Sequence, residues 1–191
     1  MRLFVGIEIS PAVIAATIEL IAQLRAASAT LAPRSRITWV TAERLHITIR
    51  FIGHVDDTRA DEIRAVLAPP LPMEPFNLTI AGVGTFPPKG SPRVVWAGLT
   101  GGCDRLMAIE STVSERLAGA GVPREERPYN PHLTLARVRD AAGLRPAPFV
   151  GNRREISLGT TSVDAITLFE SRLSPKGPTY VELARTPLVG D

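Results

Sequence analysis

One four-residue pattern occurs twice in this chain, as His46-Ile47-Thr48-Ile49 and again, 86 residues later, as His132-Leu133-Thr134-Leu135. In an extended strand, side chains two positions apart share a face. Each copy therefore places a histidine and a threonine on one face and two aliphatic residues on the other. The 191 residues include three histidines, so the recurrence of the pattern at two of them indicates a functional site that draws on both copies.

The rest of the chain alternates between helical and extended patterns. Helical spacing of apolar residues predicts helices over 11–29, 57–67 and 104–118, and alternation predicts strands around both patterns. Further strands are expected near the N-terminus and over 76–83, 93–99, 156–158, 163–170 and 179–183. This order predicts an α+β fold with mainly antiparallel sheets and flanking helices. The spacing of the two patterns favours two related lobes within a single domain that spans residues 1–191.

Composition narrows the class of protein. No apolar run reaches the roughly 18 residues of a membrane span, so no membrane association is expected. The N-terminus reads as a strand rather than a signal peptide, and the expected location is cytoplasmic. The single cysteine, Cys103, excludes an internal disulfide and a cysteine-based metal cage. A net charge of +3, with 20 arginines against two lysines, is compatible with a nucleic-acid substrate but does not demonstrate one.

A pair of histidines is suited to general acid–base attack of water on a phosphodiester. One imidazole takes a proton from water while the other gives a proton to the leaving oxygen. The two threonine hydroxyls would hold the non-bridging oxygens as negative charge builds on them. A strained cyclic phosphate fits this chemistry, because its leaving group needs little further activation.

Two other kinds of catalysis are weighed against this one. His46, His54 and His132 could supply three metal ligands, but no H-E-x-x-H motif or cluster of aspartates accompanies them. A nucleophilic mechanism lacks a G-x-S-x-G motif, and Cys103 has no histidine near it in sequence. We therefore expect a site without metal or cofactor.

Residues 46–53 and 131–137 resemble the two signature motifs of the two-histidine (2H) phosphoesterases, in the RNA 2′,3′-cyclic phosphodiesterase or 2′-5′ RNA ligase-like branch. The similarity extends to residues 2–5, 39–40, 92–99 and 168–171, and to Gly177 and Tyr180. It implies a bilobal fold, with two pseudo-twofold related lobes around a central cleft. It also implies hydrolysis of a terminal 2′,3′-cyclic phosphate to a 2′-phosphate without metal.

The resemblance further implies a role for each polar residue of the two patterns. His46 corresponds to the proton donor and His132 to the acceptor that activates water. Thr48 and Thr134 correspond to the residues that bind the phosphate, and Arg137 resembles the family's phosphate-contacting arginine. Strand alternation, however, puts Arg137 on the face opposite His132, so it reaches the site only if the strand twists, bulges or ends there.

Arg50 has the alternation that would bring it to the face of His46, and it is the second candidate for a phosphate-binding arginine. Aromatic residues near the motifs or loops could stack on the terminal base. These candidates are Trp39, Phe51, Phe86 and Tyr129.

The expected partner is an RNA with a 2′,3′-cyclic phosphate end, such as a tRNA fragment, or a small nucleotide, and the protein is expected to be a monomer. Two alternatives stay open. One is a 2H phosphoesterase for a 2′-5′-linked oligonucleotide or a cyclic nucleotide derivative, with reverse RNA ligation as a further activity. The other is a protein that binds RNA ends without turnover.

Overall fold

The computed structural model describes residues 1–175 and 177–190 of the 191-residue chain. Over these residues it contains ten strands, four α-helices and two short 3₁₀ helices. In chain order they are β1 (Arg2–Glu8), α1 (Pro11–Leu31), β2 (Arg36–Trp39), η1 (Ala42–Arg44), β3 (His46–His54), α2 (Asp57–Leu67), β4 (Leu71–Pro72), β5 (Phe76–Phe86), β6 (Val94–Gly101), α3 (Cys103–Gly119), β7 (Leu133–Asp140), α4 (Pro146–Val150), η2 (Gly151–Glu155), β8 (Ser157–Val163), β9 (Ala165–Ser174) and β10 (Gly177–Val189).

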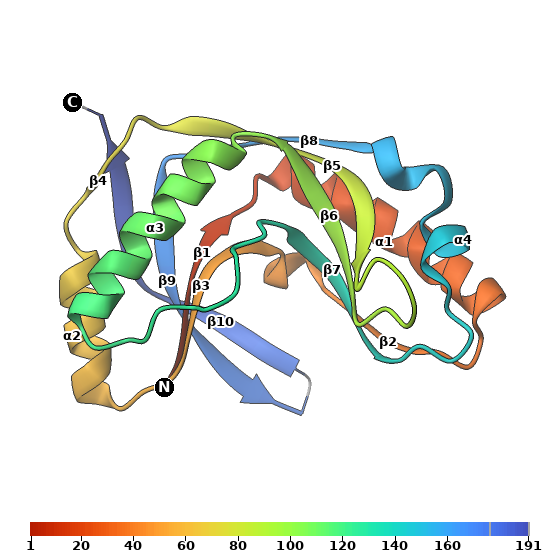
Figure 1. Cartoon of the computed structure of the whole chain (residues 1–191), viewed down its shortest axis with the longest axis horizontal. Coiled ribbons are helices and arrows are strands. Elements are labelled where there is room, and N and C mark those ends of the chain that lie inside the picture. The colour runs from red at the N-terminus through yellow and green to blue at the C-terminus, as the bar shows by residue number, and fades with distance from the viewer. Residues whose placement is uncertain (176, 191) are drawn as a thin grey trace.

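All ten strands join in one sheet, in the order β4-β10-β9-β1-β3-β7-β6-β5-β8, with β2 paired to β7. Every pairing is antiparallel except the short one between β10 and β4. The predicted α+β class is therefore confirmed. The expected separate sheets instead form one continuous, strongly curved sheet, which Figure 1 shows arching across the molecule.

The two halves of this sheet meet where β3 pairs with β7, through the single partner pair Ile47 and Leu133. These residues occupy the second position of each four-residue pattern, so the two patterns run antiparallel about this point. In antiparallel register the residue before one partner lies toward the residue after the other. His46 is thereby directed toward Thr134, and His132 toward Thr48.

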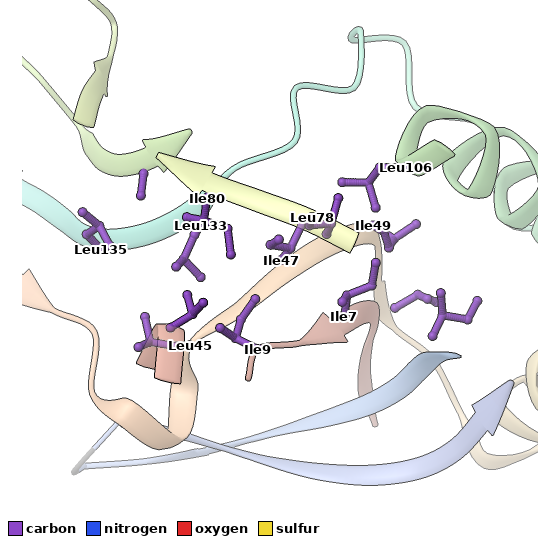
Figure 2. Close-up of a cluster of buried hydrophobic side chains, with 14 of the residues drawn as sticks. Ile7, Ile9, Leu45, Ile47, Ile49, Leu78, Ile80, Leu106, Leu133 and Leu135 are labelled. Carbon is purple, nitrogen blue, oxygen red and sulfur yellow. The ribbon is translucent and has the colours of Figure 1, made fainter. Parts of the chain in front are cut away.

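The aliphatic residues of both patterns form the centre of the core. Ile47 and Leu133 have no exposed surface, and Ile49 and Leu135 are also buried. Figure 2 shows them packed among residues of β1, β5 and α3, including Ile7 and Leu78. Burial of these aliphatic side chains orients the histidine and threonine on the other face of each strand.

The helices cover the two halves of the sheet separately. Helix α1 packs against β8 and α4, while α2 and α3 contact each other and α3 lies against β3 (Figure 1). Helix α2 begins where the Asp56 side chain accepts a hydrogen bond from the backbone N–H of Arg59, at 2.8 Å. Ser10 precedes α1 but does not cap it, because its backbone N–H donates to the Thr161 hydroxyl and its own hydroxyl donates to the Thr160 carbonyl.

Helix α1 bears on the expectation that the chain has no membrane span. It spans 21 residues and is long and apolar enough, by length and composition alone, to cross a membrane. Its inner face nevertheless contributes Val13, Leu20 and Leu24 to the core, each 1% exposed or less. A core helix of a soluble protein passes the same test of length and composition.

Candidate active site

The two histidines are held in the same way. The Nδ1 atom of His46 lies 2.8 Å from the carbonyl oxygen of Arg44, and that of His132 lies 2.7 Å from the carbonyl oxygen of Asn130. A carbonyl only accepts hydrogen bonds, so Nδ1 carries the proton in both rings. The Nε2 atom of each histidine is therefore the one that can accept or donate a proton in a reaction.

Each strand carries a bulge at the fourth residue of its pattern. Along β3, pairing with β1 passes from Thr48 to Arg50 and skips Ile49. Along β7, pairing with β6 passes from Thr134 to Ala136 and skips Leu135. An extra residue in one strand exchanges the faces of the residues that follow it.

The bulge in β7 brings Arg137 to the histidine face. Arg137 lines the same pocket as His46, Thr48 and Thr134. The sequence predicted that Arg137 could reach the site only if its strand twisted, bulged or ended there. The structure contains such a bulge.

The bulge in β3 has the opposite effect on Arg50, and the predicted facing of this residue is wrong. Arg50 is 6% exposed and does not line the pocket. Its guanidinium donates to the carbonyl oxygen of Pro123 and lies 3.8 Å from the Glu125 carboxylate. Arg50 therefore ties β3 to the segment between α3 and β7. By the same shift, Phe51 moves to the pocket face.

The pocket has a volume of about 600 Å³ and is lined from both halves of the sheet, by β1, β3, β9 and β10 on one side and by β2 and β7 on the other. Three arginines line it, Arg2, Arg44 and Arg137, and its described lining contains no acidic residue. A concave surface with positive charge and no carboxylate favours an anionic ligand. His132 is not among the lining residues, although its neighbour on the same face, Thr134, is. Two other hollows, around residues 88–93 and 138–148, contain neither histidine.

The threonines can orient an oxyanion beside the histidines. The Thr48 hydroxyl lies 3.0 Å from Nε2 of His46. With Nδ1 protonated, the neutral ring accepts this hydrogen bond and the charged ring donates it. Thr134 lines the same pocket, so both threonines and Arg137 border one space.

Burial lowers the pKa of both histidines below the ordinary imidazole value. For His46, the hydrogen bond to the Arg44 carbonyl opposes this effect, whereas the positive charges of Arg137 and His132 lower the pKa further. For His132, the Asn130 carbonyl raises the pKa and Arg137 lowers it. The charge of Arg137 therefore acts on both rings, and the two histidines lie within electrostatic reach of each other.

Aromatic rings contact both histidines. Phe4 and Tyr180 contact His46, with ring centroids 4.7 and 5.0 Å away, and Phe86 contacts His132 edge-on at 5.2 Å. Two of the aromatic candidates from the sequence, Trp39 and Phe51, line the pocket. Phe86 and Tyr129 do not line it.

Four charged or aromatic pocket residues were not singled out as site residues from the sequence: Arg2, Phe4, Arg44 and Tyr180. Arg2 and Phe4 come from β1, Arg44 from η1 and Tyr180 from β10. The pairing of β1 with β3 and β9, and of β9 with β10, gathers them. Arg44 could have been found from the sequence because it lies two residues before His46. The other three lie in segments that resemble the 2H phosphoesterases.

The described residues contain no group of three histidine, cysteine or acidic side chains placed to hold a metal ion. His54 is the last residue of β3 and does not line the pocket. Cys103 is the first residue of α3, and its thiol sulfur lies 3.6 Å from the Leu99 carbonyl oxygen. Neither residue joins His46 and His132 in the site.

The chain as a whole is similar to known proteins. The family model of the 2′-5′ RNA ligase superfamily matches residues 11–174. An RNA 2′,3′-cyclic phosphodiesterase of Aeropyrum pernix is 38% identical over 146 residues, which cover 75% of this chain and 82% of that protein.

Solved structures show the same arrangement over the whole chain. A protein of Thermus thermophilus superposes with a TM-score of 0.72 at 27% identity and covers 100% of both chains. Escherichia coli LigT, complexed with 3′-AMP, superposes with a TM-score of 0.68 at 26% identity, covering 98% of this chain and 97% of that one.

Proposed function

Because the chain belongs to the 2′-5′ RNA ligase superfamily of 2H phosphoesterases, we propose that it hydrolyses the 2′,3′-cyclic phosphodiester at RNA 3′ ends to a 2′-phosphomonoester. The observation that carries this proposal is the local twofold arrangement of the two patterns about Ile47 and Leu133. It puts His46 and both threonines on the lining of one electropositive pocket, and it puts His132, also protonated on Nδ1, next to that lining on the face of Thr134. The chemistry these residues supply is proton transfer and oxyanion binding.

The position of the pocket supports distinct roles for the two histidines. The pocket lies beside His46, and a nucleoside seated there presents its ribose oxygen to Nε2 of His46. The far side of the phosphorus then faces His132, which lies outside the pocket lining. His46 is accordingly the proton donor to the leaving oxygen, and His132 is the base that activates water.

The reaction proceeds by in-line displacement. His132 Nε2 accepts a proton as the water oxygen bonds to phosphorus, the bond from phosphorus to the 3′ oxygen breaks, and His46 Nε2–H protonates that oxygen. Each proton transfer typically contributes about 10²–10⁴ in rate. Thr48, Thr134 and Arg137 hold the non-bridging oxygens, where a single donor can be worth about 3 kcal/mol in the transition state.

The proposed mechanism is consistent with a domain of two lobes. The halves of the sheet would act as two pseudo-twofold related lobes of one domain, each supplying one histidine and one threonine. Because both histidines come from one chain, a monomer suffices for catalysis.

The nature of the pocket supports a nucleotide as its occupant. LigT of Escherichia coli was solved with 3′-AMP, and the relative from Aeropyrum pernix is an RNA 2′,3′-cyclic phosphodiesterase. Trp39, Phe51 and Tyr180 line the pocket here and offer aromatic surface for a base.

The test is incubation with an RNA that ends in a 2′,3′-cyclic phosphate, in the presence of a chelator, with identification of the product. We expect a 2′-phosphate, and loss of at least about 10³ in kcat/KM for His46→Ala and for His132→Ala. His54→Ala is the matched control, because this third histidine lies outside the pocket. A 3′-phosphate product would reverse the histidine roles.

The same assay separates the alternatives. Faster cleavage of a 2′-5′-linked oligonucleotide or of a cyclic nucleotide derivative would make that compound the substrate. Tight binding of the RNA end without any product would identify a binding protein and overturn the catalytic proposal.

A further inference from the structure

The three arginines of the pocket act on different groups. Arg137 is among the main influences on the pKa of both histidines, whereas Arg2 and Arg44 are not. All three act on the hydroxyl of Tyr180, whose pKa is raised by burial and lowered by these positive charges. The Tyr180 ring contacts His46 at 5.0 Å. Tyr180 thus contacts a catalytic histidine, and its hydroxyl lies within electrostatic reach of Arg2 and Arg44, which line the same pocket. We call this pair of arginines the second cationic region.

The structure holds Arg44 against the hairpin of β9 and β10. A Cβ atom added to Gly177 would lie 2.5 Å from a terminal nitrogen of the Arg44 guanidinium. Gly177 also has a positive φ of 104°, which favours glycine. The absence of a side chain at Gly177 thus lets the guanidinium lie next to the hairpin backbone at one end of the pocket.

The second cationic region can bind an anion other than the reacting phosphate. The reacting phosphate is served by Arg137, the two threonines and the two histidines, which already match its oxygens. Arg2 and Arg44 add two further positive charges to the pocket, and its described lining residues include no carboxylate. The planar guanidinium forms paired hydrogen bonds with phosphate oxygens, and arginine is the preferred residue for such contacts.

We propose that Arg2 and Arg44 form a second phosphate site, which binds the phosphodiester on the 5′ side of the terminal nucleoside. This inference rests on the proposed function. The terminal nucleoside lies between the two sites, against Tyr180, so the pocket recognises the end of a nucleotide chain and not only a cyclic phosphate. The substrate class is then an oligonucleotide of at least two residues.

The experiment compares kcat/KM for two substrates, a nucleoside 2′,3′-cyclic phosphate and a dinucleotide that ends in the same group. We expect the dinucleotide to be preferred by at least about tenfold at low salt, the gain from one charge-assisted contact. Replacing its internal phosphodiester by an uncharged methylphosphonate should remove most of this preference. The preference should also fall as salt rises, because phosphate contacts weaken with salt.

Variants assign the preference to residues. Arg2→Gln and Arg44→Gln should each lower kcat/KM for the dinucleotide about tenfold more than for the mononucleotide, the loss of one charge-assisted contact. Arg172→Gln is the matched control, because this arginine lies on the same hairpin, is 62% exposed, pairs with Glu170 and does not line the pocket.

A second variant moves Arg44 without removing its charge. Gly177→Ala places a methyl group where the guanidinium lies, and it should lower the dinucleotide preference as Arg44→Gln does. Gly90→Ala is its control, because Gly90 has a similar positive φ of 81° and open space around it. The Gly90→Ala variant introduces the same kind of backbone strain as Gly177→Ala but does not displace the Arg44 guanidinium.

The outcomes separate this inference from the function on which it rests. Equal kcat/KM for both substrates, or equal losses on both in the arginine variants, would overturn the second phosphate site and leave the catalytic proposal intact. If neither substrate is hydrolysed, the catalytic proposal fails. Calorimetric binding of the 2′-phosphorylated dinucleotide and mononucleotide then decides the second site: a preference lost in Arg44→Gln supports it, and equal affinities overturn it.

Discussion

Arg137 affects the pKa of both histidines, so replacing Arg137 tests the electrostatics of the site. Its positive charge lowers the pKa of both rings. Arg137→Gln should therefore raise both values, because each imidazolium loses a repulsive neighbour. The acid limb of the pH profile of kcat/KM follows the base, which must be neutral, and the alkaline limb follows the acid, which must be protonated. Both limbs should move to higher pH.

The same substitution removes a donor to the phosphate, so kcat/KM at the optimum should fall by about 10²–10³. Arg139→Gln provides the control, since Arg139 lies two residues further along β7 and is not among the charges that act on either histidine. Limbs that stay in place, or that move to lower pH, would show that Arg137 does not set the protonation of the pair.

At the scale of elements, the segment between α3 and β7 determines where His132 lies. The Tyr129 hydroxyl donates to the Thr48 carbonyl oxygen at 2.9 Å, and Arg50 donates to the Pro123 carbonyl. These contacts fasten the segment to β3, next to the Asn130 carbonyl that holds His132. Burial raises the pKa of Tyr129, so its hydroxyl stays a donor throughout the working range of the histidines.

Tyr129→Phe should therefore reduce kcat several-fold while leaving KM nearly unchanged, because Tyr129 does not line the pocket. It should also lower the free energy of unfolding by about 1 kcal/mol, for one lost hydrogen bond. The control is Glu125→Gln, which weakens only a 3.8 Å ion pair to a 56% exposed carboxylate and should change neither quantity measurably. A change in KM alone would contradict a positioning role and place Tyr129 in contact with substrate.

Elements with regular periodicity were the predictable part of the fold. The helix expected over 57–67 has those bounds, and the one expected over 11–29 extends by two residues to Leu31. The bulges at Ile49 and Leu135 could not be read from the sequence, since they depend on which residues the partner strand meets. Alternation through those positions therefore gave the wrong face for Arg50 and left Arg137 undecided.

At the scale of the whole molecule, the pocket combines residues that sequence reasoning could and could not gather. The repeated pattern was sufficient to single out His46, Thr48 and Thr134, which line one pocket. Arg2 and Tyr180 stand far apart in sequence, and they meet only because β1 pairs with β9 and β9 with β10. A single sequence carries no local signal for such long-range pairing.

The junction between the sheet halves sets the relative position of the two histidines, because it consists of one partner pair, Ile47 and Leu133. Ile47→Ala leaves a cavity at this fully buried position and should cost about 2–4 kcal/mol of stability. We expect kcat to fall by at least about tenfold as well, since a shift of about 1 Å between reacting groups can cost about 10² in rate. Ile63→Ala is the matched control: Ile63 is equally buried, but it lies on α2. Thermal unfolding should show similar losses for both variants, whereas kcat, measured well below either midpoint, should fall only for Ile47→Ala. Equal activity in the two variants would mean that the junction does not hold the histidines in register.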